Sequence, residues 1–167
     1  MKAIDALYEA QKIVFSPFVF QTVYSMYELG LFEIINEQKE GLTIDKIAEK
    51  SKVSKYGVTV LIEMAEAAEI VEKLEGDKYQ LTKVGYFILR DEMTRVNMMF
   101  TQDVCYEGLY HLKDAISTTS PAGLKVFGDW KTVYEGLASL PASVKKSWFE
   151  FDHFYSDNSF DDALKII

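Results

Sequence analysis

Residues 42–90 read LTIDKIAEKSKVSKYGVTVLIEMAEAAEIVEKLEGDKYQLTKVGYFILR. Apolar residues recur at helical spacing in two segments of this stretch, and the polar turn Ser51-Lys52 separates the segments. Thr43 and Ser54 stand at the start of the two segments, where a hydroxyl side chain caps a helix. Two helices joined by a short turn are the helix-turn-helix pattern. The apolar face of the second helix is predicted to consist of Val58, Leu61, Ile62, Ala65 and Ala68.

Two alternating segments follow the second helix, at residues 71–74 and 78–81. The glycine-centred turn Glu75-Gly76-Asp77 separates them, which predicts a β-hairpin and the chain's only β-structure. Thr82 is expected to cap a further helix, with three apolar side chains facing inward: Val84, Phe87 and Ile88. The predicted fold is therefore mainly α, a winged helix-turn-helix with one small β-hairpin wing, flanked by N-terminal and C-terminal helices.

The flanking segments divide the chain into residues 1–41, 42–90 and 91–167. Three short helices are expected in the first, with Ser16 and Pro17 starting the second of them. The last segment is expected to be helical, with one helix around residues 109–116 and a loop at 117–123. Large aromatic residues are abundant near its end, and such rings are buried in a core, in a dimer interface or in a ligand pocket.

The charge of the chain conflicts with a DNA-binding reading of the central fold. The formal net charge is −8, so the summed field repels phosphate backbones. The second helix, which reads DNA in such folds, is predicted to carry Glu63, Glu66 and Glu69 against Lys55 alone. Residues 42–90 hold as many acidic as basic side chains, so nucleic acid is a disfavoured partner. Without a signal peptide or an apolar run long enough for a membrane span, the chain is expected to be cytoplasmic.

The sequence offers no pattern for catalysis, cofactor binding or metal binding. No Gly-x-Gly pair is present, so neither a Rossmann nor a phosphate-loop site is predicted. His111 and His153 lack the partner spacing of a metal site. Cys105, the only cysteine, has no neighbouring His or Lys to activate it and is expected to be a buried thiol in a helix. Catalytic, cofactor-binding and metal-binding residues are therefore assigned to no position.

Several short motifs together resemble one family, the N-terminal dimerisation domain of class I S-adenosylmethionine-dependent O-methyltransferases. The motifs are Leu29-Gly30-Leu31-Phe32, the helix-turn-helix, Tyr79-Gln80-Leu81-Thr82 with Gly85, Phe127-Gly128-Asp129-Trp130 and the aromatic helix from Trp148 to Tyr155. The resemblance implies that residues 1–41 are dimerisation helices and that the protein is a homodimer. It also implies that the catalytic domain, with its S-adenosylmethionine site and histidine base, follows residue 167, so this segment alone is expected to be non-catalytic.

The family resemblance also implies a role in closing the pocket for a small-molecule acceptor. Trp148, Phe149, His153 and Phe154 are the candidates for lining that pocket, and burial in an interface or interdomain core is the competing interpretation. The leading hypothesis is thus the dimerisation and substrate-capping region of an O-methyltransferase. Two alternatives stay open, a winged-helix transcriptional regulator that binds DNA and a stand-alone interaction module.

Overall fold

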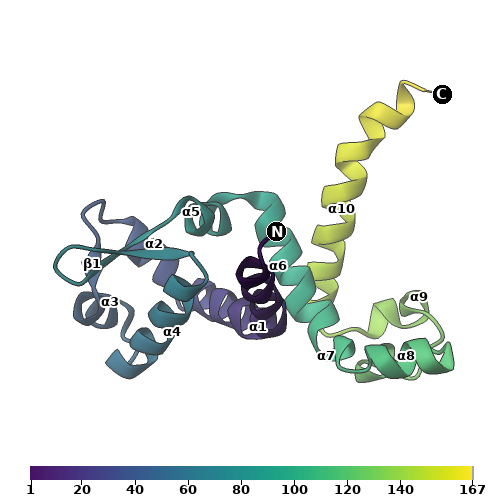
Figure 1. The fold of residues 1–167 in the computed structure, drawn as a ribbon. Coiled ribbons are helices and arrows are strands. Elements are labelled where there is room, and N and C mark those ends of the chain that lie inside the picture. The colour runs from purple at the N-terminus through teal and green to yellow at the C-terminus, as the bar shows by residue number, and fades with distance from the viewer. Residues whose placement is uncertain (167) are drawn as a thin grey trace. The chain divides into compact units, whose positions relative to one another are not determined.

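The computed structural model describes residues 1–166, and the side chains of all of these except 158, 161 and 162. The chain forms two compact units, Met1–Asp91 and Glu92–Ile167, which are described separately (Figure 1). Helices dominate both units, and the one sheet is small and antiparallel. The predicted mainly α fold with a small β wing is confirmed.

The first unit begins with a single long helix, α1 (Ala3–Glu28), which runs through Pro17. The prediction that Ser16 and Pro17 start a new helix is therefore wrong. Proline lacks the N–H that would donate to the Ile13 carbonyl one turn earlier. The Ser16 hydroxyl donates to that carbonyl instead, at 2.8 Å. The residue that resembled a helix cap thus compensates for a proline inside the helix.

The centre of the first unit is the short helix α2 (Leu31–Asn36), which packs against four other elements of the unit. Gly30, with a left-handed φ of 68°, lets the chain turn between α1 and α2. Three of the six residues of α2 are buried. The largest side chains that are fully shielded from solvent are those of Met26, Leu31, Phe32, Ile35, Ile47, Val58, Ile62 and Val71.

The predicted helix-turn-helix consists of α3 (Ile44–Ser51) and α4 (Lys55–Ala67). The Thr43 hydroxyl accepts a hydrogen bond from the Lys46 N–H, and the Ser54 hydroxyl accepts one from the Gly57 N–H, so both predicted caps are confirmed. The helix α4 ends earlier than the charge pattern indicated. Glu69 lies beyond it with a left-handed φ of 59°, so this acidic residue is not part of the helix.

The sheet contains three strands, β1 (Leu42–Thr43), β2 (Val71–Leu74) and β3 (Lys78–Leu81), in the order β1-β3-β2. The hairpin of β2 and β3 was predicted and is confirmed, with Gly76 and Asp77 both at positive φ in its turn. The expectation that the hairpin is the only β-structure is wrong. β1 pairs antiparallel with β3, placing Leu42 opposite Tyr79.

The first unit ends with α5 (Lys83–Arg90), which Thr82 caps by accepting a hydrogen bond from the Gly85 N–H. A Cβ atom on Gly85 would lie 2.4 Å from the Ile70 carbonyl oxygen, so only glycine allows this close approach. The predicted inward direction of two side chains is wrong, because Val84 and Phe87 are more than half exposed. The helix contacts the rest of its unit around Gly85 rather than along the predicted apolar face.

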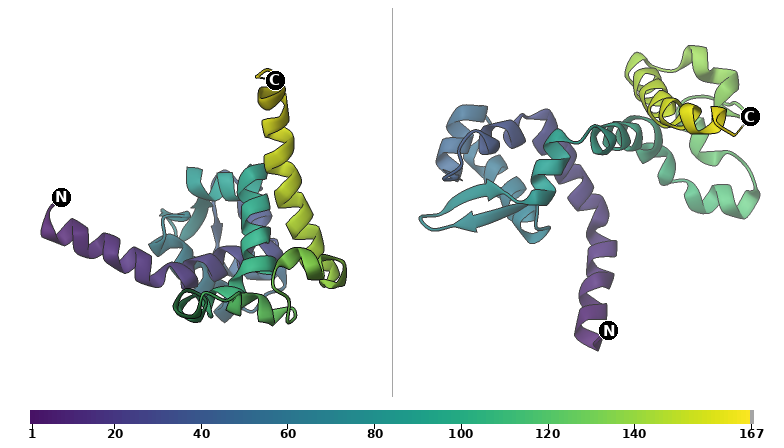
Figure 2. Two further views of the ribbon diagram at one scale, coloured as in Figure 1. Left: turned by 90° about the vertical axis from the view of Figure 1, so that its right-hand side faces the viewer. Right: turned by 90° about the horizontal axis from the view of Figure 1, so that it is seen from above.

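The second unit is a pair of long helices joined by a more irregular connection (Figure 2). Its elements are α6 (Glu92–Phe100), the π-helix η1 (Thr101–Cys105), α7 (Tyr106–Leu109), α8 (Leu112–Thr118), the 3₁₀ helix η2 (Ala122–Val126), α9 (Val133–Gly136), the 3₁₀ helix η3 (Leu137–Ser139) and α10 (Ala142–Leu164). The predicted helix at 109–116 is interrupted between α7 and α8. A Cβ atom on Gly123 would lie 2.7 Å from the Gly108 carbonyl oxygen, so the backbones of η2 and α7 touch there.

The helix α10 packs against α6 and η1. The rings of Phe100 and Phe151 stack between these helices, with centroids 3.9 Å apart. In the left view of Figure 2, the first part of α10 lies beside α6 and the remainder extends past it. None of the described side chains of α10 after Ser147 is buried.

Candidate functional site

The N-terminal half of α1 is an exposed helix with large apolar side chains. Every residue from 1 to 18 is exposed, and this half projects from the rest of its unit in the right view of Figure 2. Leu7 is 57% exposed and Phe18 is 61% exposed. A helix of this length is marginal in water unless its apolar side packs against something. Exposed apolar patches of this kind mark interaction surfaces.

A groove lies between the second half of α1 and α4, in the same unit. Its volume is about 520 Å³. The lining is mostly apolar, and its one charged member is Glu63. The lining residues are Phe18, Gln21, Thr22, Ser25, Val60, Leu61, Glu63, Met64 and Ala67. The groove and the exposed half of α1 therefore share one helix and offer an apolar surface for a partner.

Two lysine side chains of the helix-turn-helix lie in ion pairs with neighbouring carboxylates. Lys55, the basic residue at the start of α4, forms a 2.6 Å ion pair with Asp45 on α3. Lys50 likewise pairs with Glu37 at 2.9 Å. These exposed pairs add little to stability, but they place a carboxylate beside each cation. No observation here supports the DNA-binding alternative.

The four candidate pocket residues all lie on α10, but they do not converge. The Trp148 ring is half-buried and contacts Phe100 and Tyr134, with centroids 5.9 and 6.2 Å away. Phe149 and His153 form a second, exposed contact one turn apart. Successive residues of a helix point about 100° apart, so Trp148 and Phe149 face different directions.

Phe154 is half-buried and packs edge-on against Tyr155. The Tyr155 hydroxyl donates to Asn97 Oδ1 on α6 at 2.9 Å. His153 Nδ1 lies 3.9 Å from Asp157 on the exposed side of α10. The structure therefore divides the predicted site residues between the α6-facing side of α10, represented by Trp148, and a side with the exposed pair of Phe149 and His153.

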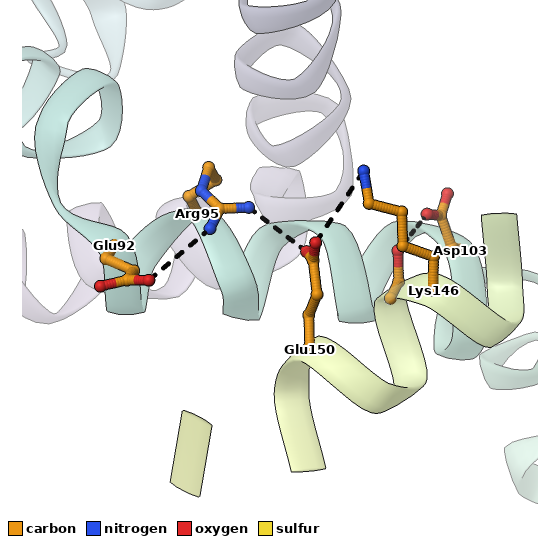
Figure 3. A network of polar contacts seen from close by, with 6 residues as sticks. Glu92, Arg95, Asp103, Lys146 and Glu150 are labelled. Atoms are coloured by element: carbon orange, nitrogen blue, oxygen red, sulfur yellow. Dashed lines mark hydrogen bonds and ion pairs between the residues drawn. The ribbon is translucent and has the colours of Figure 1, made fainter. Parts of the chain in front are cut away.

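A polar network links α10 to α6 and η1, and sequence reasoning did not find it (Figure 3). Arg95 lies between Glu92 and Glu150 and forms its shorter ion pair, 3.3 Å, with Glu150. Lys146 approaches the same carboxylate at 3.9 Å. Deeper in the unit, the buried Ser147 hydroxyl donates to the Asp103 carboxylate at 2.5 Å. The only signal in the sequence is that Lys146, Ser147 and Glu150 are three or four residues apart or adjacent, which places them on one side of a helix.

The remaining reactive groups are the lone thiol and the possible metal ligands among the residues that the structure describes. Burial raises the pKa of the Cys105 thiol, which disfavours the thiolate that a nucleophile requires. Among the described residues, no group of three or more His, Cys, Asp or Glu side chains is placed to hold a metal ion. Across the same described part of the chain, none of the helices combines the length and apolar character needed to cross a bilayer.

The first unit matches a known family. The family model for the Dimerisation2-like domain aligns with residues 8–79. Residues 8–79 are thus similar to a Dimerisation2-like domain. The resemblance to a dimerisation domain, inferred from the sequence motifs, is therefore confirmed. A search of curated proteins gave no significant match.

Several solved structures share the fold of the Dimerisation2-like domain and of much of the second unit. The S-adenosylmethionine-dependent methyltransferase SibL has a TM-score of 0.75 at 19% identity, and the alignment covers 89% of this chain and 44% of the SibL chain. RosA from Streptomyces davawensis, an N,N-8-amino-8-demethyl-D-riboflavin dimethyltransferase, has a TM-score of 0.67 at 19% identity, covering 99% and 48%. The structure of a pericyclic reaction enzyme has a TM-score of 0.73 at 12% identity, and the alignment covers 90% of this chain and 40% of that enzyme.

At these identities the likeness establishes the fold alone. The chain spans less than half the length of each of these three proteins. The exposed half of α1 from Tyr8 onward and the whole α1–α4 groove fall inside the segment that the family model matches. The candidate pocket residues of α10 fall outside it.

Proposed function

We propose that the Dimerisation2-like domain joins two copies of this chain into a homodimer. The observation that carries the proposal is the exposed apolar half of α1 beside an apolar groove on the same domain. Each surface exposes apolar area to water in a single copy, and its burial against a second copy is favourable. Most soluble oligomers are homodimers of this closed, two-fold type.

The homodimer is tested by placing one charge on the exposed apolar half of α1. Leu7→Lys is expected to shift the chain from dimer to monomer in sedimentation velocity at micromolar concentration, because it puts an ammonium group into an apolar interface. The matched control is Ile13→Lys, which lies about one and two-thirds turns further along the same helix, points about 120° away from Leu7 and is 74% exposed. A parent chain that sediments as a monomer would contradict the proposal, as would equal dissociation by both variants.

We further propose that the chain is the N-terminal, substrate-capping region of an S-adenosylmethionine-dependent O-methyltransferase that acts on a small molecule in the cytoplasm. The fold shared with SibL supports methyl transfer, and the similar fold of the mitomycin 7-O-methyltransferase MmcR supports oxygen as the acceptor. In this proposal the cofactor site belongs to a catalytic domain that residues 1–167 do not contain. The acceptor pocket is closed by the side of α10 that carries Phe149 and His153.

Calorimetry with S-adenosylmethionine tests whether the cofactor site lies outside residues 1–167. The 167-residue chain is expected to give no binding heat, and a micromolar affinity would overturn the assignment of the cofactor site to another domain. In a longer protein that includes the catalytic domain, His153→Ala is expected to raise KM for the acceptor while leaving the dimer intact. An unchanged KM would remove His153 from the pocket.

A further inference from the structure

One stripe of α1 runs through both the exposed half of the helix and the groove. Its positions alternate in steps of three and four residues, the spacing of a coiled-coil seam. The stripe consists of Ile4, Leu7, Gln11, Val14, Phe18, Gln21 and Ser25. The first four lie on the exposed half, and the last three line the groove beside α4. We call the first four residues of the stripe the projection. The same helix therefore carries this projection and, further along the stripe, three residues that line the groove.

Antiparallel pairing of two α1 helices brings the projection of one copy to the groove of the other. With the two-fold axis at position 16, Leu7 faces Ser25 of the second copy and Val14 faces its Phe18. The same register places Gln11 opposite Gln21 of the second copy. Side-chain amides can donate to and accept from each other, so this register places the two amide side chains of the stripe opposite compatible groups. Polar pairs of this kind fix the register of helix pairs.

A register shifted by one heptad lacks this agreement. Moving the axis toward the N-terminus sets Leu7 against Phe18 of the second copy and Gln11 against Val14. The Gln11 amide would then lose its polar partner on the facing helix, which costs free energy in a buried seam. The shift also leaves Ser25 without a partner on the facing helix. Pairing centred on position 16 uses the whole length of α1.

The helix dipoles favour the same antiparallel arrangement. The N-terminal end of α1 is the positive end of its dipole, and it carries Lys2 together with Asp5 in its first turn. The C-terminal end carries Glu28, and its last turn has no basic residue. Antiparallel pairing places each positive end beside the negative end of the other helix, and a parallel pair would place like ends together.

We propose that two copies pair their α1 helices antiparallel about position 16, so that Leu7 and Val14 of each copy face the groove between α1 and α4 of the other. The inference rests on the proposed homodimer and specifies its geometry. The contact is isologous, because projection and groove exchange roles under the two-fold axis, and it closes at two copies. It also accounts for the exposure of the N-terminal half of α1 in the single chain.

Disulfide cross-linking tests the register in a Cys105→Ser background, which removes the only native cysteine. The chain carrying Leu7→Cys and Ser25→Cys is expected to form a covalent dimer on mild oxidation, seen on a non-reducing gel. The two cysteines are about 27 Å apart along one helix and cannot link within a chain. Leu7→Cys alone is the control for parallel pairing, and Leu7→Cys with Phe18→Cys reports the shifted register.

The outcomes separate this inference from the homodimer itself. A chain that sediments as a dimer but links through Leu7→Cys alone, or preferentially through the pair of positions 7 and 18, overturns the proposed register and leaves the homodimer standing. A parent chain that sediments as a monomer overturns both. Both substituted positions are at least partly exposed, so the fold is expected to persist by circular dichroism.

A charge-rescue experiment provides a second test that does not need cysteines. Leu7→Lys is expected to abolish the dimer, and adding Ser25→Glu is expected to restore at least half of it at the same concentration, because the two charges face each other across the pair. Phe18→Glu is the matched control and is expected not to rescue Leu7→Lys. Rescue by Phe18→Glu but not by Ser25→Glu would overturn the proposed register.

Discussion

The two units of the chain differ most in how completely they bury their own side chains. In the first unit, Phe32, Leu31 and Met26 are entirely shielded from solvent, and helices and sheet surround them. In the second unit, the buried apolar side chains among the described residues are few and none is fully shielded: Val96, Met98, Leu140 and Val144. The first unit has a core of its own. The second unit has a seam between two helices.

The seam of the second unit depends on ring stacking and on polar contacts rather than on a deep apolar core. Phe100 and Phe151 stack at its centre, and the network around Arg95 and Ser147 fixes the relative position of α6 and α10. Polar contacts of this kind specify geometry more than they add stability. The difference teaches that the first unit is built to fold by itself, whereas the second unit is built to present long helices.

Separating the units is expected to have the largest effect. A fragment of residues 1–91 should unfold in one cooperative urea transition, because it retains the complete core around Phe32. A fragment of residues 92–167 should show helical circular dichroism but no cooperative transition. Equal cooperativity of the two fragments would contradict the comparison.

Within the whole chain, Phe32→Ala is expected to lower the free energy of unfolding of the first unit by about 3–5 kcal/mol, because it leaves a cavity in a closely packed core. Phe149→Ala is the matched substitution in the second unit, where the ring is 41% exposed. Its expected cost is less than about 1 kcal/mol, because the exposed ring leaves no closed cavity. Denaturant titration followed by circular dichroism measures both, and similar costs would show that the second unit has a core of its own.

Gly85→Ala is expected to destabilise the first unit by about 1–3 kcal/mol, because the added methyl group would overlap the Ile70 carbonyl. Gly57→Ala is the control in α4, where the nearest atoms are side-chain atoms at 3.2 Å. That substitution should change stability by less than about 1 kcal/mol, since helix propensity favours alanine. The ratio of the two effects in thermal denaturation measures how rigidly Ile70 is held.

The smallest effects are expected in the polar network of the second unit. Ser147→Ala removes a buried hydroxyl that donates to a carboxylate and should cost about 1.5 kcal/mol. Arg95→Gln removes an ion pair that is about one third exposed and should cost less than about 1 kcal/mol. The melting temperatures of the two variants measure both losses of stability. A larger loss for Arg95→Gln would show that the ion pair contributes more than the buried hydrogen bond.

Local signals in the sequence predicted the first unit well. The caps at Thr43, Ser54 and Thr82 are encoded within three residues, and the structure contains all of them. β1 was missed because its two residues pair with Tyr79 and Lys78, far away in the sequence. Pro17 was misinterpreted because proline inside a helix and proline in a first turn look alike without their surroundings.

The second unit was harder to predict because its contacts are few and distant. Neither the π-helix at Thr101–Cys105 nor the touching backbones of Gly108 and Gly123 leaves a periodic signal. The sequence indicated correctly that the aromatic residues lie on one long helix. It could not show that Trp148 packs against Phe100 while Phe149 stays exposed, because that depends on which side of α10 meets α6.

The proline in α1 has a consequence for the dynamics of the chain. At Pro17 the regular ladder of backbone hydrogen bonds lacks one donor, so the exposed half before it can open without disturbing the half anchored by Met26. We expect amide hydrogen exchange to be fast from residue 3 to residue 14 in a dilute sample and to slow as protein concentration rises. In the proposed homodimer, assembly would therefore stabilise the N-terminal half of α1, and dimer formation and local folding would be coupled.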